Sequence, residues 1–295
     1  MRTHRNFLNL PHESSDKATA RYAVLGVPYE GTVSYKTGTA AGPEAIIEAS
    51  AQVEKLDEET LMDHTAAGIA TYPPVRSATT PQEQMKRVRA ASAKIISEGK
   101  FLLTLGGEHS ITAPIVESII ETHGPVSVLQ IDAHGDLRET YCGTRCSHGA
   151  VMRRVLEITD SLCQVGIRSF SKEELDECPG QVKRFITPRM IARDARWIDK
   201  VIARLGKKVY VTIDIDGLDP AYAPGTGTPE PGGMDWWQIT DLLRSVCSQR
   251  EVVGADIVEV RPIPPNHITE YLAARLAYKI IAYHQRPLPD GGSRV

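Results

Sequence analysis

Short apolar segments rich in β-branched residues alternate along the chain with longer amphipathic segments. The apolar segments predict six strands, over residues 22–26, 101–105, 126–132, 162–165, 209–214 and 252–259. The amphipathic segments predict helices over residues 80–99, 111–122, 195–205, 236–250 and 268–285. Strands that alternate with helices in this way are typical of a mainly parallel sheet with crossover helices, so the pattern predicts an α/β fold.

The chain shows no internal repeat and no low-complexity segment. Its 295 residues, 41% of them hydrophobic, are enough for one substantial core. We therefore expect a single domain over residues 1–295, with residues 287–295 as a flexible tail. The net charge of −3 and the lack of any long block of like charges argue against nucleic acid or an anionic membrane surface as a partner.

The composition also indicates where the protein works. The N-terminus is polar, and no apolar run reaches the roughly 18 residues that would span a bilayer. The five cysteines form no C-x-x-C pair, which favours reduced thiols in a soluble, cytoplasmic protein. Cys142 and Cys146 form a C-x3-C arrangement, but no second pair is present to complete a zinc site of that type.

Side chains able to bind metals or move protons occur where the predicted strands end. Asp132 and Asp214 each end an apolar strand, His109 follows a third, and Glu259 ends a fourth. In open α/β sheets, ligands bind beyond the carboxyl ends of the strands. Four strands are therefore expected to deliver acid or imidazole groups to one edge of the sheet.

Two short clusters strengthen this interpretation. The first places Asp132, His134 and Asp136 at every second position, and the second places Asp214 and Asp216 in the same spacing. One such pair alone could consist of solvated loop residues or helix caps. Two clusters, each at the end of an apolar strand and accompanied by a histidine, favour a metal site.

The number of charges favours two ions. Four carboxylates crowded together repel one another and raise their pKa values unless cations intervene. Two divalent ions would balance four aspartates, and bridging carboxylates would set the ions about 3.5–4 Å apart. Oxygen-rich ligation with a minority of imidazole suits Mn²⁺, although Ni²⁺ or Co²⁺ could take its place.

Several segments of the chain together resemble the signatures of the ureohydrolases, the arginase–agmatinase family. They are GGEHS (106–110), DAHGDLR (132–138), SHG (147–149), DIDGLDPAYAPGTGTPEPGG (214–233) and VEVRP (258–262). Their order matches, and the similarity extends from the loop at 27–43 to the last helix. Residues 136–154 make the chain most similar to the bacterial and archaeal agmatinases.

The resemblance implies a role for each candidate residue. One manganese would be held by His109, Asp132, Asp136 and Asp214, and the other by Asp132, His134, Asp214 and Asp216. His148 matches the proton-shuttling histidine of the family, and Glu259 matches the glutamate that binds the guanidinium of the substrate. The family fold is a three-layer α/β/α domain around an eight-stranded, mostly parallel sheet, and its members assemble as homotrimers or homohexamers.

This assignment agrees with the chemistry that the residues can perform. Two metals can lower the pKa of a bridging water and hold the resulting hydroxide against the poorly electrophilic guanidinium carbon. A carboxylate at Glu259 would orient the planar cation through paired hydrogen bonds. Asp136 could relay the proton of the hydroxide, and an exposed His148 could exchange it with solvent, so that the leaving amine becomes protonated. The products would be urea and an amine.

The segment after Asp136 bears on the substrate. It reads RETYCGTRCS and lacks the Asn-rich stretch with which arginases bind the amino-acid end of arginine. This favours agmatine, with putrescine as the product. Agmatine ends in an ammonium group, for which Glu30, Tyr35, Glu139 and Tyr141 are available as binding residues near the site.

Arg261 departs from the family pattern, which has a small or polar residue at this position. If Arg261 points into the pocket, it disfavours a cationic tail and favours a carboxylate such as that of 4-guanidinobutanoate. Arginine and guanidine are further alternatives.

Other classes of protein, and simpler roles for single residues, are alternatives at this point. A zinc deacetylase of related fold would hold one metal, and an inactive relative could serve as an interaction subunit. Taken alone, His148 could be a helix-cap residue and Glu259 could pair with Arg261. Asp219 is expected to be a turn residue rather than a ligand.

Overall fold

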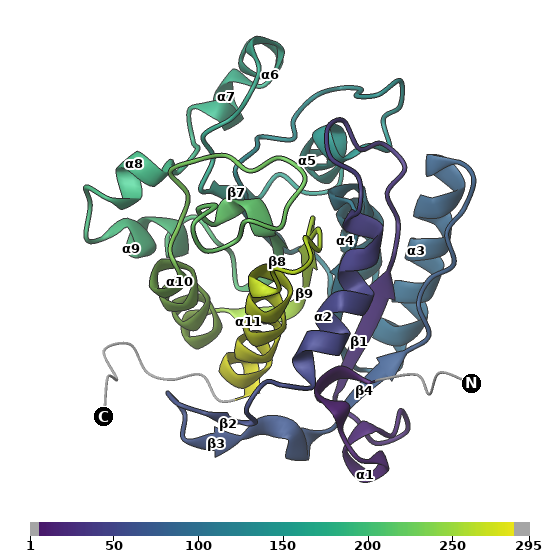
Figure 1. Ribbon diagram of the computed structural model, residues 1–295. Helices are drawn as coiled ribbons and strands as arrows, with labels where there is room; N and C mark the ends of the chain where they lie inside the picture. Colours follow the sequence, from purple (N-terminus) through teal and green to yellow (C-terminus); the bar gives the residue numbers. More distant parts are fainter. Residues whose placement is uncertain (1–5, 286–295) are drawn as a thin grey trace.

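The computed structural model describes residues 6–285, and its centre is a sheet of seven strands (Figure 1). In spatial order the strands are β4 (Ile69–Tyr72), β1 (Tyr22–Val27), β5 (Phe101–Gly106), β9 (Glu251–Val258), β8 (Lys208–Asp214), β6 (Ser127–Ile131) and β7 (Leu162–Val165). Every pair of neighbours in this sheet is parallel. The predicted α/β class is confirmed. Two short strands, β2 (Leu56–Asp57) and β3 (Met62–Asp63), form a separate antiparallel pair.

The helices of the described chain vary in length from one turn to five. They are α1 (His12–Ser15), α2 (Gly42–Ser50), α3 (Pro81–Ser97), α4 (Thr112–His123), α5 (Val151–Leu156), α6 (Lys172–Glu177), α7 (Pro179–Val182), α8 (Pro188–Ile191), α9 (Trp197–Ile202), α10 (Trp236–Gln249) and α11 (Ile268–Gln285). Figure 1 shows α10 beside α11 and α3 beside α4, and both pairs are in contact.

The strands supply two separate cores because successive side chains point to opposite faces of a sheet. Tyr22 and Val24 of β1 pack into one core, which includes Ile46 of α2. Ala23 and Leu25 of the same strand pack into the other core, which includes Val88 and further residues of α3 and α4. The sheet is thus buried on both faces between two layers of helices, as the α/β/α prediction requires.

The prediction of an eighth strand in this sheet is wrong for the described residues. Next to β7, the position of a further strand is taken by a single bridge between Val165 and Ile186. Ile186 N donates to Gln164 O at 3.0 Å, and Gly166 N donates to Ile186 O at 2.8 Å. The pairing stops there because Thr187 caps α8 and Pro188 begins it, so the chain turns into a helix instead of extending.

The predicted elements lie within a few residues of the observed ones, but several observed elements were not predicted: β2, β3, β4, α1, α2, α5, α6, α7 and α8. Strand β4 was not predicted, because it has four residues at the edge of the sheet and is followed by Pro73 and Pro74. Helix α2 was also missed, since it begins with Gly42 and Pro43 directly after a long loop. The helix predicted at 195–205 is shorter, at Trp197–Ile202.

Two further predictions concern membrane-spanning helices and the C-terminal tail. Among residues 6–285, no helix combines the length and the apolar character needed to cross a membrane. The tail predicted at residues 287–295 lies outside the described residues.

Candidate metal centre

The four central strands of the sheet lead into the predicted site. Strands β5, β9, β8 and β6 are consecutive neighbours. His109 begins a 3₁₀ turn after β5, Glu259 directly follows β9, Asp214 ends β8, and Asp132 directly follows β6. Because the strands are parallel, their carboxyl ends meet at one edge. The remaining candidates lie in the segments that follow the strands at this edge: His134 and Asp136 in a loop, and His148 and Asp216 each in a short 3₁₀ helix.

Two overlapping groups of metal-competent side chains form at this edge. One group contains His109, Asp132 and Asp214, and the other contains Asp132, His134 and Asp216; within each, the ligand atoms lie within 4.8 Å of one another. Asp132 belongs to both groups. Its Oδ2 lies 3.1 Å from His109 Nδ1, and its Oδ1 lies 3.6 Å from His134 Nδ1. A carboxylate in this position can be shared by two ions.

The other predicted ligands extend these two groups. Asp136 Oδ2 lies 3.1 Å from His109 Nδ1, and Asp214 Oδ2 lies 3.5 Å from the same atom. In the second group, His134 Nδ1 lies 3.1 Å from Asp216 Oδ2. The structure therefore brings together the six residues that were predicted as ligands.

Each of the four carboxylates in this cluster is more than nine-tenths buried. Burial of several negative charges together is unfavourable unless positive charges or protons compensate them. Burial and the Asp132 carboxylate raise the pKa of Asp136 to about 7. Burial, Asp216 and Asp132 raise the pKa of Asp214 well above its ordinary value. Burial lowers the pKa of His109, but the carboxylates around the ring outweigh this and raise that pKa well above its usual range. The metal-free cluster thus retains protons that divalent cations would displace.

The hydrogen bonds of His109 leave one ring nitrogen for a metal ion. Nε2 lies 2.9 Å from Thr212 Oγ1, and this hydroxyl donates to Asp256 Oδ1 at 2.6 Å, so Nε2 carries the proton that it donates to Thr212. Nδ1 is buried and has no hydrogen-bond partner in the described part of the chain, although three carboxylates surround it. Once Nδ1 loses its proton, the imidazole nitrogen and the carboxylate oxygens around it form a donor set that divalent metals accept. The residues present fit a metal site.

Glu259 lies beside this cluster, and one of its carboxylate oxygens accepts a hydrogen bond from a backbone amide. Its Oε1 accepts a hydrogen bond from His109 N at 2.8 Å. Arg261 does not pair with it, since Arg261 Nε donates to Thr37 O at 2.7 Å. The alternative in which Glu259 is only the ion-pair partner of Arg261 is therefore wrong.

His148 is half-buried, which corrects the expectation that it is exposed. Its ring lies edge-on to Tyr141, with the ring centroids 5.2 Å apart and an interplanar angle of 87°. Its Nδ1 lies 3.2 Å from Thr32 Oγ1. Burial lowers the pKa of His148 to about 4, so the imidazole of the metal-free protein is neutral at physiological pH.

Two of the candidate residues adopt a backbone conformation that few side chains tolerate. Asp136 has a φ of 55° and Glu259 has a φ of 61°, both in the left-handed region that favours glycine. Their neighbours hold them there: Asp136 O accepts from Met152 N at 3.0 Å, and Glu259 N donates to Gly107 O at 2.7 Å. Non-glycine residues in this region cluster at functional sites.

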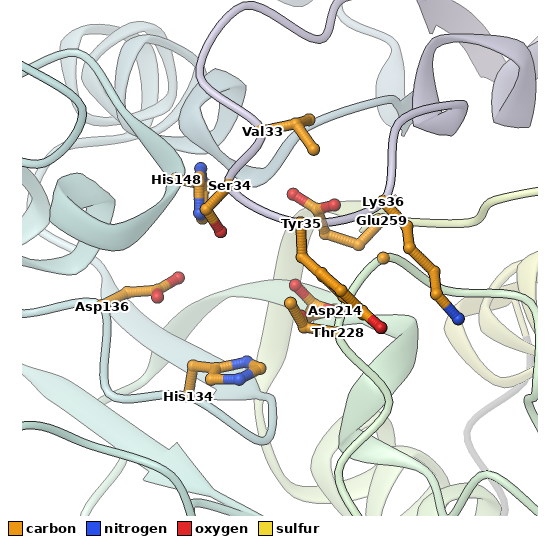
Figure 2. A pocket seen from close by; sticks show the side chains of 11 residues that line it. Val33, Ser34, Tyr35, Lys36, His134, Asp136, His148, Asp214, Thr228 and Glu259 are labelled. Carbon is orange, nitrogen blue, oxygen red and sulfur yellow. The ribbon is translucent and has the colours of Figure 1, made fainter.

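A cavity opens above the cluster, and Figure 2 shows the side chains that surround it. Figure 2 places His148 and Asp136 on one side, and Glu259, Asp214 and Thr228 on the other. The loop that contains Tyr35 contributes the remaining wall. The lining residues are Val33, Ser34, Tyr35, Lys36, His134, Asp136, His148, Asp214, Gly227, Thr228 and Glu259.

The residues predicted to be available for the substrate tail have different positions. Tyr35 lines the cavity. Glu30 instead accepts hydrogen bonds from the backbone of the same loop, at Gly38 N and Ala40 N. Glu139 is paired with Arg154, and Arg261 lies against the loop backbone rather than in the cavity wall.

Polar residues within the apolar strands were missed, although the sequence carried a signal for them. Gln130 and Thr212 each lie two positions before the terminal aspartate of a strand, and therefore on the same face as that aspartate. Gln130 Nε2 donates to Asp132 Oδ2 at 2.7 Å, and Thr212 holds His109 as described above. Asp219 was predicted correctly, since its carboxylate accepts hydrogen bonds from Ala221, Gly232 and Gly233 in a turn. Cys142 and Cys146 are free thiols outside both metal-competent groups of the described residues.

Comparison with known proteins places the chain among proteins of related sequence and fold. The model of the arginase family matches residues 20–282. The chain is 38% identical to the N(1)-aminopropylagmatine ureohydrolase of Synechocystis sp. over 90% of both chains, and 33% identical to the agmatinase of Pyrococcus horikoshii over 96% of this chain and 99% of the other. The agmatine ureohydrolase of Thermoplasma volcanium has a similar structure, with a TM-score of 0.86, 31% identity and coverage of 96% of this chain and 95% of that one.

The fold, the carboxylate–imidazole cluster and these relatives define a metal-binding hydrolase that acts on the carbon–nitrogen bonds of linear amidines. The chain belongs to the arginase family. The resemblance to the ureohydrolases is thereby confirmed.

Proposed function

We propose that the protein hydrolyses the guanidino group of agmatine to urea and putrescine. The observation that carries this proposal is the pair of metal-competent groups that share Asp132, with the half-buried Glu259 in the wall of the same cavity. The relatives named as agmatinase and as agmatine ureohydrolase support the choice of substrate.

The first metal would be held by His109, Asp132, Asp136 and Asp214, and the second by Asp132, Asp214, His134 and Asp216. We propose Mn²⁺ for both, because four of the six ligands are carboxylates and two are imidazoles. When bound, two divalent ions supply an activated water as nucleophile and stabilise negative charge in the transition state.

The side chains around the metals would bind the substrate and move its protons. Glu259 accepts two hydrogen bonds from the guanidinium, and this fixes the plane of the substrate against the metal side of the cavity. Asp136 lines the cavity beside the proposed metals and would take the proton that the nucleophile loses. His148 exchanges protons between the cavity and solvent, so that the leaving amine departs in protonated form.

A second candidate substrate is N(1)-aminopropylagmatine, which bears an additional aminopropyl group. The 38% identity with the Synechocystis enzyme named for this substrate favours it. Arg261 no longer argues for an acidic tail, because it contacts Thr37 O and does not line the cavity. Lys36 does line the cavity, so 4-guanidinobutanoate stays in the set of substrates to be tested.

The experiment that tests the proposal is a urea-release assay with five substrates. They are agmatine, N(1)-aminopropylagmatine, 4-guanidinobutanoate, arginine and guanidine, each assayed with Mn²⁺, Ni²⁺ and Co²⁺. We expect the highest kcat/KM with agmatine and Mn²⁺. A preference for another substrate would replace agmatine in the proposal. Absence of urea with all of them, together with one bound zinc per chain, would favour the deacetylase alternative.

Replacement of Glu259 by glutamine should lower kcat/KM without loss of metal. A neutral amide loses the charge-assisted hydrogen bonds to the guanidinium, which are worth roughly 3 kcal/mol, or about 100-fold in rate. Its carbonyl oxygen can still accept from His109 N, so the metal ligands should stay in place. Steady-state kinetics and metal analysis of the purified variant measure both effects.

A matched control is available at the other end of the same strand. Glu251 is the first residue of β9 and is exposed, so Glu251→Gln should retain the activity of the unmodified protein. Loss of metal from the Glu259 variant would show that this carboxylate belongs to the metal site rather than to the guanidinium.

Assembly and location are further parts of the proposal. We propose a homotrimer or homohexamer in the cytoplasm; size-exclusion chromatography with light scattering tests the assembly.

A further inference from the structure

We infer that Thr32 and Glu108 are positioning residues that determine which ring nitrogen of His148 faces the cavity. The inference rests on the role of His148 in the proposed function. It concerns two residues outside the metal ligands: Thr32, on the loop that forms part of the cavity wall, and Glu108, in the segment that follows β5. Thr32 contacts Glu108 on one side and the His148 imidazole on the other.

The hydroxyl of Thr32 has a complete set of partners. It donates its single proton to Glu108 Oε1 at 2.7 Å. Its two lone pairs face His148, where Nδ1 lies at 3.2 Å and the backbone N at 3.4 Å. Because the hydroxyl proton is directed to the carboxylate, Thr32 can only accept from the ring, so Nδ1 of His148 carries a proton.

Glu108 keeps the hydroxyl in this orientation. Its side chain has no exposed surface, and its Oε2 accepts from Gly31 N at 2.8 Å and from Thr32 N at 2.6 Å. With both oxygens receiving donors, the carboxylate offers Thr32 an acceptor and nothing else.

The consequence for His148 is a defined tautomer. With the proton on Nδ1, the neutral ring presents the lone pair of Nε2, which can accept a proton and return it. Tyr141 lies edge-on against the ring and limits its rotation, and Figure 2 shows the ring at the margin of the cavity. Histidines in catalytic sites commonly depend on such a partner for their orientation. Here the partner of His148 is the Thr32 hydroxyl, and the buried Glu108 side chain sets the orientation of that hydroxyl.

The first test replaces Thr32 by valine, which has the same shape but no hydroxyl. The backbone bonds of residues 31 and 32 to Glu108 remain, so the loop should keep its position. We expect kcat with agmatine to fall about 10- to 100-fold, KM to stay within about twofold, and metal content to be unchanged. Thr32→Ser restores the hydroxyl and should return kcat to within about threefold of the unmodified protein.

A matched control lies on β5. The hydroxyl of Thr104 is buried and has no hydrogen-bond partner among the described residues, so Thr104→Val should leave kcat unchanged. The double variant Thr32→Val with His148→Asn should be no slower than His148→Asn alone, because Thr32 acts through His148. Unchanged kcat in Thr32→Val, or additive losses in the double variant, would overturn the inference.

A second variant tests Glu108 without a change of volume. In Glu108→Gln the carbonyl oxygen can still accept from the two backbone amides, while the new amide group donates to Thr32 Oγ1. The hydroxyl must then donate to His148 Nδ1, which moves the ring proton to Nε2. We expect a loss of kcat comparable to that of Thr32→Val, with the metals retained.

A measurement that does not depend on enzyme activity distinguishes failure of this inference from failure of the proposed function. Long-range ¹H–¹⁵N correlation spectra of histidine-labelled, metal-free protein at pH 8 report which ring nitrogen is protonated, and His148→Asn identifies the signal of His148. We expect the proton on Nδ1 in the unmodified protein and on Nε2 in Glu108→Gln. The opposite tautomer in the unmodified protein would refute the inference even if urea is released. Absence of urea with every substrate would refute the proposed function while this spectrum still decides the role of Thr32 and Glu108.

Discussion

Replacement of Asp214 by asparagine should lower urea release at least about 1000-fold and leave no more than one metal ion per chain. Asp214 ends β8, and its Oδ2 lies 3.5 Å from His109 Nδ1 in the first metal-competent group. We propose that it is shared by both ions. A neutral amide is a poor bridging ligand, and loss of a bridge affects the whole metal pair. A 1000-fold fall corresponds to about 4 kcal/mol of lost transition-state stabilisation.

Asp132→Asn should give the same result, because Asp132 is common to both groups. Metal content is measured by mass spectrometry after gel filtration, and turnover by urea release. The control is Asp219→Asn, because the Asp219 carboxylate accepts hydrogen bonds from backbone amides of its turn. This variant should keep both metals. Two metals per chain in either the Asp132 or the Asp214 variant would contradict the bridging role.

Removal of the metals should lower the melting temperature, and this loss should be larger at pH 8 than at pH 5. Ions present at about 1000 times their dissociation constant stabilise the folded state by roughly 4 kcal/mol per site. For a chain of this size we expect a decrease of about 10 °C or more at pH 8 after dialysis against a chelator. At pH 5 the decrease should be only a few degrees, because protons compete for the same ligands.

The direction follows from the pKa shifts of the metal-free cluster. The pKa of Asp136 is raised to about 7, so its stabilising contribution is complete below its ordinary pKa of 3.8 and is lost as the pH rises through about 7. Asp214 and His109 also have raised pKa values, so they lose stabilisation in the same direction. The pKa of Asp132 is lowered, but its effect falls below this pH range. The metal-free protein should therefore become less stable between pH 5 and pH 8.

Scanning calorimetry of metal-loaded and metal-free protein at both pH values measures the effect. The difference between the two forms removes the contributions of groups remote from the cluster. Asp214→Asn serves as the control, since its melting temperature should change much less on addition of chelator. An equal decrease at pH 5 and pH 8 in the unmodified protein would show that the cluster does not exchange protons for metal.

The sequence predicted the positions of the site residues because strand ends can be recognised locally. Asp132 and Asp214 each follow a run of apolar residues, and a parallel sheet brings such ends to one edge. What could not be predicted was the order of the strands, which depends on contacts between distant segments. This order makes β5, β9, β8 and β6 neighbours and so places His109 and Glu259 beside the aspartates.

Side-chain hydrogen bonds between residues that are distant in the sequence could not be predicted either. Thr32 and His148 are 116 residues apart, and no local pattern connects them. The half-buried state of His148 depends on Tyr141 and on this loop, which is why the expectation of an exposed ring was wrong. The missing eighth strand had a local cause, Pro188, but its effect on sheet pairing depends on where Ile186 meets β7.

The left-handed backbone at Asp136 and Glu259 has a consequence for protein engineering. Glycine adopts this conformation without the cost of roughly 1–3 kcal/mol that other residues bear, and it would also remove an acidic side chain from the site. A library screened only for heat resistance would therefore enrich inert molecules with glycine at these two positions. Screening such a library for turnover and for heat resistance together is needed to obtain robust enzymes.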